Sequence, residues 1–208
     1  KQIKRDDIIT ISQEHSFINN EKYIKKVRKS FRHIKYLIVM TNGAKEKYDE
    51  WLENEKIKPE VVVIPNMIKE NKNAKLSTLC NNQIISVGRL EEVKDFYTLI
   101  LVFSVITKKY PKIILKIIGE GSQRKVLEEL IEKCNLEKKV ILTGKLTENE
   151  INNEFLKSDI FVLTSKSESF SLVLCEAMNY GLPCVAFDVD VGPREIIQEG
   201  KNGFLIKN

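Results

Sequence analysis

The chain has 208 residues, of which 42% are hydrophobic and 30% are charged, and its formal net charge is +5. These proportions fit a soluble globular protein, and no apolar run approaches the roughly 20 residues that a membrane-spanning helix needs. The first residues, KQIKRDD, contain neither a Met nor an apolar signal region, so we expect a piece of a longer protein without a secretory signal.

Short runs rich in Ile and Val alternate with helical patterns along the chain. The expected strands are residues 7–12, 36–41, 60–65, 83–89, 112–119, 139–144, 159–165 and 183–188, and the expected helices are 20–35, 43–55, 96–110, 122–134, 148–157 and 170–180. Strands that are apolar on both faces are typical of a parallel sheet covered by helices. The fold class is therefore α/β, a Rossmann-like doubly wound parallel sheet with a partial second α/β unit.

The first expected helix is strongly basic. Residues 22–35 hold seven Lys or Arg and no acid, with Tyr23, Val27, Phe31 and Ile34 at helical spacing. One interpretation is an ordinary amphipathic helix with a solvated basic face. The other is peripheral contact with an anionic membrane or a phosphate-bearing acceptor. Nucleic acid is not expected as a partner, because no aromatic interleaving or nucleic-acid motif accompanies the charge.

The polar stretch that begins after Pro65 has little periodicity and divides the chain. We expect a first unit at residues 1–66, a linker at 67–82 and a second unit at 83–208. The second unit has enough strands to bury a core alone. Thr147 and Glu150 have the spacing of a capping box, which supports this segmentation.

The four cysteines are Cys80, Cys134, Cys175 and Cys184, and none forms a C-x-x-C pair. Three of them lie in or beside apolar patterns, so we expect them to be buried and reduced. A zinc site is not expected, because only two histidines accompany them. Reduced cysteines indicate the cytosol.

Cations and glycines follow four expected strands. They are Arg89 and Lys94, Gly119–Gly121, Lys145 with Leu146, and the segment that contains Glu168. Ligands bind beyond the carboxyl ends of parallel strands, and cations, glycines and a helix N-terminus together suit a phosphate. Each feature alone is more simply explained as a structural one, such as a tight turn or a surface charge. Their joint placement after successive strands indicates a phosphate-binding site.

The stretch ESFSLVLCE, residues 168–176, has a glutamate at each end. If its helix begins near Phe170, the free N–H groups of Ser171 and Leu172 favour an anion. Glu168 and Glu176 can then accept hydrogen bonds from hydroxyls on either side of it. The ligand that this arrangement predicts is a nucleotide sugar.

Four segments carry a family resemblance: VGRLEEVK, IIGEGSQRKVLEELIEK, VILTGKL and ESFSLVLCEAMNYGLPCVAFDVDVGPREIIQEGKNGFLI. With them the chain resembles the retaining glycosyltransferases of family 4, which have the GT-B fold of two facing Rossmann-like domains. The last segment contains the family's E-x7-E motif as Glu168 and Glu176, then E-A-M-x-x-G-x-P and G-x-x-E-x-I. Residues 1–66 look like the last third of the family's N-terminal domain. We expect the rest of that domain, and the final helices, to lie outside this chain.

The resemblance implies roles for individual residues. The diphosphate clamp would be Arg89 and Lys94, and the catalytic set would be Arg89, Lys94, Glu168 and His15, with His15 reaching the donor sugar across the cleft. Glu176 would hold the ribose, and the backbone of Lys145 and Leu146 would follow the base. The whole donor-binding set would be Gly88, Arg89, Lys94, Gly119, Lys145, Leu146, Glu168, Ser169, Phe170, Ser171, Leu172 and Glu176.

Three positions depart from the family pattern. At the position of Ser169 the family often has Gly, and at the position of Ser171 it commonly has Gly or Pro. Asp95 follows the clamp lysine, where the family often has Gly or Asn. These changes leave the diphosphate clamp intact and bear on the sugar preference.

The expected function is a retaining hexosyltransferase. It would transfer a sugar from a nucleoside diphosphate, UDP by expectation, to a glycan or lipid-linked acceptor in bacterial surface polysaccharide or oligosaccharide biosynthesis. No cofactor or metal is expected, because the cations and a helix dipole offset the leaving charge. The expected location is the cytoplasm, at the inner face of the membrane if residues 22–35 bind lipid. Two alternatives remain open: a sugar-nucleotide epimerase on the same fold, and a non-catalytic nucleotide-sugar-binding module. This chain alone is expected to transfer little or no sugar.

Overall fold

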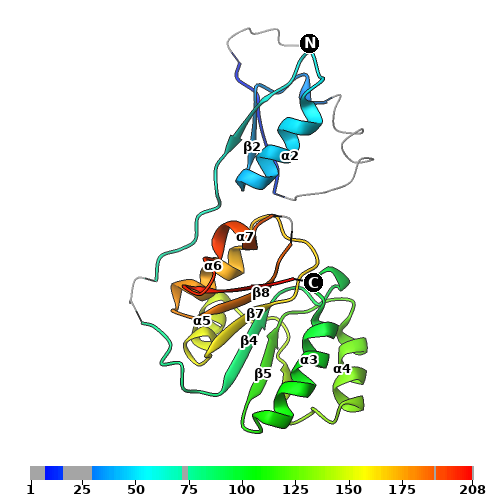
Figure 1. Ribbon diagram of the computed structural model, residues 1–208, viewed down its shortest axis with the longest axis vertical. Helices are drawn as coiled ribbons and strands as arrows, with labels where there is room; N and C mark the ends of the chain where they lie inside the picture. Colours follow the sequence, from blue (N-terminus) through cyan, green and yellow to red (C-terminus); the bar gives the residue numbers. More distant parts are fainter. Residues whose placement is uncertain (1–7, 16–29, 72–74, 190, 208) are drawn as a thin grey trace.

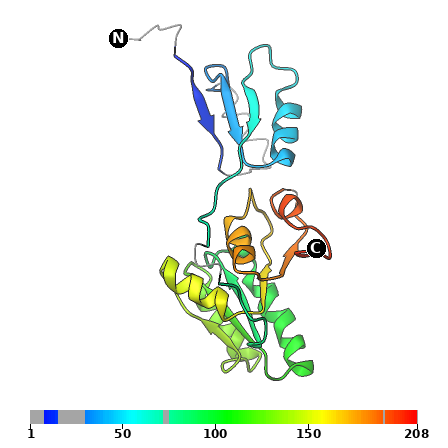
Figure 2. The same ribbon diagram turned by 90° about the vertical axis from the view of Figure 1, so that its left-hand side faces the viewer.

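The computed structural model of the chain describes residues 8–15, 30–71, 75–189 and 191–207. Within these residues the strands form two sheets, one of three strands and one of six, in which all strand pairs are parallel. We call the residues up to 66 the small unit and those from 83 onward the large unit. Figures 1 and 2 show the two units joined by one extended segment.

The small unit has the strand order β1-β2-β3. Its elements are β1 (Ile11–Gln13), β2 (Tyr36–Val39), α2 (Asn42–Leu52) and β3 (Glu60–Val63). Helix α2 begins where it does because the Thr41 side chain accepts a hydrogen bond from the Ala44 N–H, at 3.2 Å. The core is centred on Tyr48, which is 1% exposed and makes edge contacts with the rings of Phe31 and Trp51.

The large unit has the strand order β6-β5-β4-β7-β8-β9. Its strands are β4 (Gln83–Val87), β5 (Ile114–Ile118), β6 (Val140–Leu142), β7 (Ile160–Leu163), β8 (Cys184–Phe187) and β9 (Gly203–Ile206). Its helices are the 3-10 turn η1 (Glu92–Lys94), α3 (Phe96–Lys109), α4 (Arg124–Lys133), α5 (Glu148–Leu156), α6 (Leu172–Asn179) and α7 (Pro193–Ile196). The strand order reverses between β4 and β7, which makes a topological switch point.

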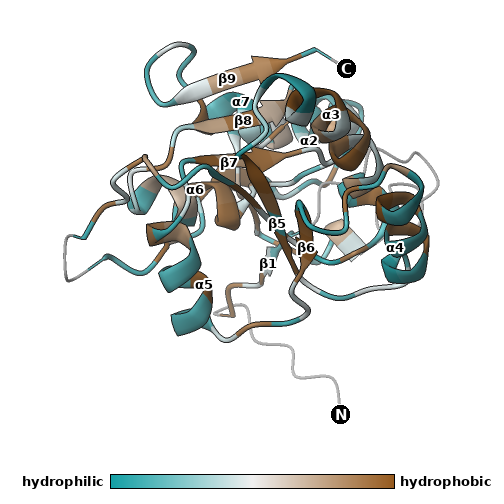
Figure 3. Cartoon of the chain, turned by 90° about the horizontal axis from the view of Figure 1, so that it is seen from below, coloured by the Kyte–Doolittle hydropathy of each residue, from teal (hydrophilic) through white to brown (hydrophobic). Residues whose placement is uncertain are grey.

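The six-stranded sheet separates two hydrophobic clusters. Ile84 and Ile117 face the cluster under α3 and α4, whereas their neighbours Ile85 and Ile118 face the cluster under α5 and α6. Successive side chains on a strand point to opposite faces of the sheet. Strands that are apolar throughout therefore contribute side chains to both clusters. Figure 3 shows the apolar strands flanked by helices, of which α4 and α5 carry hydrophilic turns. The predicted doubly wound α/β fold is confirmed.

Several expected boundaries were wrong by a few residues. The first strand begins at Ile11, because its pairing with β2 starts opposite Tyr36. The α6 helix begins at Leu172 because the residue before it, Ser171, has a left-handed backbone with φ 71°. The elements α7 and β9 were not predicted. The predicted capping box of Thr147 and Glu150 is confirmed.

The basic stretch 22–35 lies mostly outside the described residues, since the structure describes it only from residue 30. Its predicted helix and membrane contact therefore stay predictions. Of the helices that the structure describes, none is both long and apolar enough to cross a bilayer.

The cysteine prediction was correct only in part. All four cysteines are free, but only Cys184 is fully buried, while Cys80 is exposed because it lies in the polar segment before β4. Burial, with a smaller contribution from Cys175, raises the pKa of Cys184 to about 12. A thiol with so high a pKa stays protonated and unreactive.

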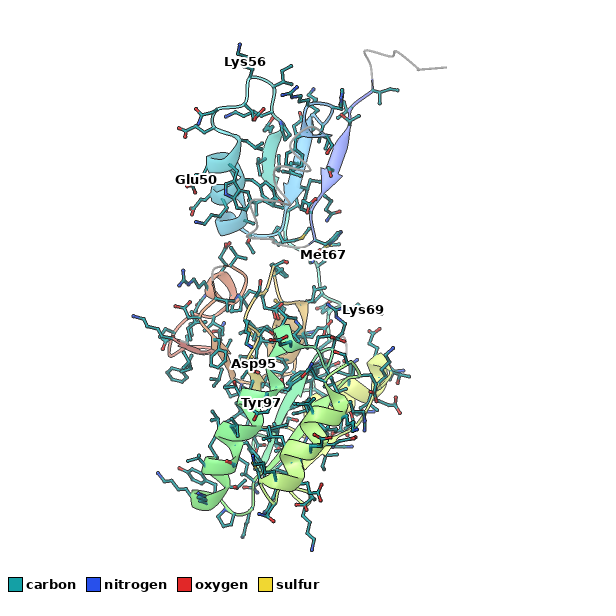
Figure 4. All side chains as sticks on the ribbon, turned by 90° about the vertical axis from the view of Figure 1, so that its right-hand side faces the viewer. Glu50, Lys56, Met67, Lys69, Asp95 and Tyr97 are labelled. Carbon is teal, nitrogen blue, oxygen red and sulfur yellow. The ribbon has the colours of Figure 1, made fainter. Side chains whose placement is uncertain are left out.

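The segment that joins the units is bonded to the large unit. Asn179 Nδ2 donates to the Lys69 carbonyl at 2.9 Å, and the Ser77 N–H donates to the Tyr180 carbonyl at 2.9 Å. Lys69 also pairs with Glu148 on α5, with Nζ 2.8 Å from Oε2. Figure 4 labels Met67 and Lys69 on this segment. The predicted boundaries at residues 66 and 83 stay predictions, although the two sheets lie on either side of them.

Candidate functional site

A cavity of about 480 Å³ lies at the carboxyl ends of the strands, between the large unit and the small unit. It contains every predicted site residue except Gly119, Lys145 and Leu146. The residues that line it are His15, Asn66, Val87, Gly88, Arg89, Lys94, Glu168, Ser169, Phe170, Ser171, Leu172, Val173 and Glu176. The small unit contributes His15, which follows the end of β1, and Asn66.

A partly buried ion pair lies in the cavity. The Nζ atom of Lys94 is 2.6 Å from Oε1 of Glu168, and the two side chains are 19% and 9% exposed. The end of β7 fixes the turn that carries Lys94, since Thr164 Oγ1 donates to the Lys94 carbonyl at 3.0 Å. Arg89, which follows the end of β4, is exposed and lines the same cavity. The cavity is thus lined by two cations, Arg89 and Lys94, and two carboxylates, Glu168 and Glu176. Lys94 pairs with Glu168, and Arg89 is the cation that offers a charge-assisted hydrogen bond to an anion.

The N-terminus of α6 points its first N–H groups at the same cavity. Ser171 is the N-cap, but its side chain does not cap the helix, and no acidic residue occupies the first turn. Its hydroxyl is buried and has no hydrogen-bond partner among the described residues. The first N–H groups of a helix have no partner within the helix, and the helix dipole makes this end positive. The arrangement suits an anion such as a phosphate.

Two of the positions that depart from the family pattern have a left-handed backbone. Ser171 has φ 71° and Asp95 has φ 47°, a region that glycine adopts without strain. Asp95 caps α3 from this conformation, because its carboxylate accepts from the Thr98 N–H at 3.4 Å and from the Thr98 hydroxyl at 2.9 Å. Ser171 is strained without a compensating cap, and such strain is found where a ligand is bound.

Glu176 joins this cavity to a second one. The second cavity, of about 890 Å³, shares Leu172 and Glu176 with the first and extends between α5, α6 and the joining segment from Met67 to Glu70. Burial by the surrounding protein raises the pKa of Glu176, and the charge of Glu148 raises it further. The two cavities together accommodate an elongated ligand with an anionic centre and a hydroxyl-bearing part near Glu176.

The glycosyl transferases group 1 family model matches residues 67–208 of the chain. The chain belongs to this family. Its predicted membership of a glycosyltransferase family is thus confirmed, and the more specific assignment to family 4 stays a prediction.

Two curated relatives have glycosyltransferase names. An uncharacterized glycosyltransferase of Haemophilus influenzae is 37% identical over 142 residues, which is 68% of this chain and 39% of that protein. A poly(ribitol-phosphate) alpha-N-acetylglucosaminyltransferase of Staphylococcus aureus is 37% identical over 122 residues, which is 59% of this chain and 24% of that protein.

Two solved structures are similar over nearly the whole chain. The pneumococcal O-GlcNAc transferase GtfA, crystallised with UDP and GlcNAc, has a TM-score of 0.81 and 26% identity over 94% of this chain and 38% of its own. TarM has a TM-score of 0.83 and 26% identity over 99% of this chain and 41% of its own. The GT-B fold is therefore confirmed, and the chain spans about two fifths or less of each of these four proteins.

Three predicted residues of this group 1 glycosyltransferase chain lie outside the first cavity. Gly119 lies against the backbone of Gly88, where a side chain would not fit. Leu146 packs against the core cluster under α5 and α6, and Lys145 is exposed beside it. Their predicted contacts with a donor remain untested.

Three of the residues that line the cavity were not predicted: Asn66, Val87 and Val173. Asn66 follows the strand β3 as Arg89 follows β4. The rule that ligands bind beyond strand ends would have found Asn66, had it been applied to the small unit as well.

Proposed function

We propose that this chain carries the donor-binding half of an enzyme that transfers a hexose-type sugar from UDP to a hydroxyl group, with retention of configuration. The observation that carries the proposal is the convergence of Arg89, Lys94 and the N-terminus of α6 on a cavity that continues past Glu176. This order of groups matches the order of charge and hydroxyls in a nucleotide sugar. The presence of UDP and GlcNAc in the solved pneumococcal relative supports it.

In the proposed reaction the bond between the sugar's anomeric carbon and the diphosphate oxygen breaks, and the acceptor oxygen bonds to that carbon on the same face. The proton of the acceptor hydroxyl goes to the departing phosphate oxygen. Arg89, Lys94 and the N–H groups of α6 stabilise the negative charge that develops on the diphosphate. Glu168 lies beside the sugar in this proposal, held by its ion pair with Lys94, and is assigned no covalent role.

The proposed acceptor is a hydroxyl of a surface glycan or of a lipid-linked oligosaccharide. Relatives with names in this area include an alpha-glucosyltransferase for poly(glycerol-phosphate) in Bacillus subtilis and an amylovoran biosynthesis glycosyltransferase in Erwinia amylovora. The proposed location is the cytoplasm, and the inner face of the membrane if residues 22–35 bind lipid. The proposal includes no metal cofactor, since the two cations and the helix dipole supply the positive charge.

Calorimetric titration of the chain with UDP, GDP and ADP, in the presence of a chelator, tests the donor site. We expect saturable binding of UDP, weaker or no binding of GDP and ADP, and no effect of the chelator. Failure of both this chain and the full-length protein to bind any of the three nucleotides would overturn the proposal. Binding that depends on a divalent cation would overturn its metal independence.

The affinity for UDP is expected to fall at acidic pH because of Glu176. The ionised carboxylate accepts hydrogen bonds from ribose hydroxyls, and its raised pKa means that it becomes protonated at a higher pH than an ordinary glutamate. Titrations from pH 8 to pH 5 should show this loss in the wild type. Glu176→Gln should bind weakly at every pH, and a wild-type affinity that does not change with pH would contradict the assignment.

The same pKa shift predicts an opposite effect on stability. A carboxyl group whose pKa is raised on folding is less stable as a carboxylate in the folded state than in the unfolded state. Its contribution to the free energy of unfolding therefore falls as the pH rises through the shifted pKa. Glu176→Gln should therefore raise the thermal midpoint at pH 7 and lose this advantage below the ordinary glutamate pKa of 4.5. A variant that is more stable but binds less tightly would identify Glu176 as a binding residue.

A further inference from the structure

The G-x-x-E-x-I motif at residues 192–197 takes no part in the proposed chemistry, yet its glutamate connects the two units. Glu195 lies on α7 of the large unit, and its carboxylate reaches the first turn of α2 in the small unit. Oε2 accepts from the Asn42 N–H at 2.8 Å and from Asn42 Nδ2 at 3.0 Å, while Oε1 accepts from the Gly43 N–H at 2.7 Å. Figure 1 shows α7 on the side of the large unit that faces α2.

Helix α2 depends on this carboxylate for its N-terminal hydrogen bonds. The side chain of its own cap, Thr41, satisfies the Ala44 N–H, which leaves those of Asn42 and Gly43 to Glu195. The first turn of α2 contains no acidic residue of its own. The negative charge that stabilises the positive end of this helix therefore comes from the other unit.

An apolar contact accompanies the charged one. Val191, in the loop between β8 and α7, is 2% exposed and belongs to the core cluster of the small unit, with Tyr48 and Leu37. An ion pair between Arg194 and Asp188 connects α7 to the end of β8, which braces the loop. The loop thus brings an apolar side chain and a carboxylate to the same end of α2.

The same loop touches the segment that carries Glu168. A Cβ atom on Gly192 would lie 3.3 Å from the carbonyl carbon and oxygen of Phe170 and 3.4 Å from Cβ of Glu168. On the other side, the small unit presents His15 to the cavity that contains Glu168. The contact at Glu195 therefore connects the two walls of the candidate site.

We infer that Glu195 is a positioning residue, which holds the small unit, and with it His15, in register with the Lys94–Glu168 pair. Its effect on sugar transfer rests on the proposed function. Its effect on the arrangement of the two units does not, and is tested separately.

Two variants weaken the contact from opposite sides: Glu195→Gln affects all three hydrogen bonds, and Asn42→Pro removes two of them and leaves the one from the Gly43 N–H. Glu195→Gln keeps the size of the side chain but removes the charge and turns an NH₂ group toward an N–H donor. Asn42→Pro removes both Asn42 donors, and proline suits the first position of a helix. The extended backbone of Thr41, with φ −140° and ψ 156°, is also the conformation that precedes proline. Glu199→Gln is the matched control, since Glu199 accepts from the Leu205 N–H within the large unit.

Residual dipolar couplings measured on the 208-residue chain test the arrangement. In the wild type and in Glu199→Gln, one alignment tensor should fit both units. In Glu195→Gln and in Asn42→Pro, each unit should still fit the structure alone, which shows that it is folded, but the common tensor should be lost. Retention of a common tensor in both variants, or its absence in the wild type, would overturn the inference.

Kinetics of the full-length enzyme test the consequence for transfer. Glu195→Gln should lower kcat and leave the affinity for UDP unchanged, because the carboxylate acts on the small unit and not on the nucleotide. A loss of UDP affinity equal to the loss of kcat would contradict a positioning role. If the full-length protein binds no UDP at all, the proposed function fails, and the dipolar couplings still decide whether Glu195 holds the units together.

Discussion

Replacing Gly119 with alanine is expected to prevent the large unit from folding stably. A Cβ atom at this position would lie 1.8 Å from the carbonyl oxygen of Gly88 and 2.9 Å from its carbonyl carbon. Neither backbone can yield, because the Gly88 N–H is bonded to the Ile118 carbonyl and the Gly119 N–H to the Gly144 carbonyl. The φ of +145° adds strain for any other residue. We expect a loss of more than about 4 kcal/mol, out of a total of about 5–15 kcal/mol for a typical protein.

Urea denaturation followed by circular dichroism measures this loss. Gly200→Ala is the matched control, since Gly200 also has a positive φ, of +72°, but has nothing within 4 Å of the added Cβ. Gly200→Ala should lower the free energy of unfolding only by the strain of a left-handed backbone, about 1–2 kcal/mol. Equal denaturation midpoints for the two variants would show that the close approach to Gly88 is not the cause.

Gly119 could be singled out from its place after a strand, but what approaches it could not be predicted. A glycine after a strand indicates a backbone that something must approach closely, and a phosphate was the expected neighbour. The neighbour that the structure shows is the backbone of Gly88, which directly follows the adjacent strand β4. Which strands pair is a property of the whole sheet, so a local motif does not contain it.

Long apolar patterns predicted the fold well, and short elements escaped prediction for a physical reason. Strands such as β4 and β5 are apolar on both faces because helices cover both sides of the sheet. By contrast, α7 has four residues and β9 is a four-residue strand that pairs with β8. Too few residues are present for a period to be visible, and the pairing partner determines the structure.

The candidate site was predicted residue by residue, but not its internal contacts. The strand-end rule and the family motif identified Lys94 and Glu168, yet their ion pair joins residues from two different strand ends. Likewise, the motif contains Glu195 without indicating that its partners are N–H groups of α2. Every residue except proline has a backbone N–H group, so the residue type does not indicate which N–H groups a distant carboxylate will bind. Such a contact is found only in the three-dimensional structure.

The substitution Lys94→Met is expected to lower both the stability of the large unit and its affinity for UDP. Methionine keeps the apolar stem of the side chain but leaves the carboxylate of Glu168, 9% exposed, without its cation. Breaking a buried pair in this way costs about 3–5 kcal/mol. Loss of one charge-assisted hydrogen bond to the diphosphate, about 1.5–3 kcal/mol, corresponds to a roughly 10- to 150-fold weaker affinity.

A second substitution separates these two effects. In Lys94→Met/Glu168→Gln no unpaired charge remains, so most of the lost stability should return while the affinity for UDP stays low. Lys116→Met is the control, because Lys116 and Glu154 form a similarly buried pair, 16% and 14% exposed, away from the cavity, although Glu154 keeps Lys157 at 3.3 Å. It should lower stability and leave UDP binding unchanged. Recovery of UDP affinity in the double variant would mean that Lys94 serves only to neutralise Glu168, and that Arg89 and the N-terminus of α6 bind the diphosphate without it.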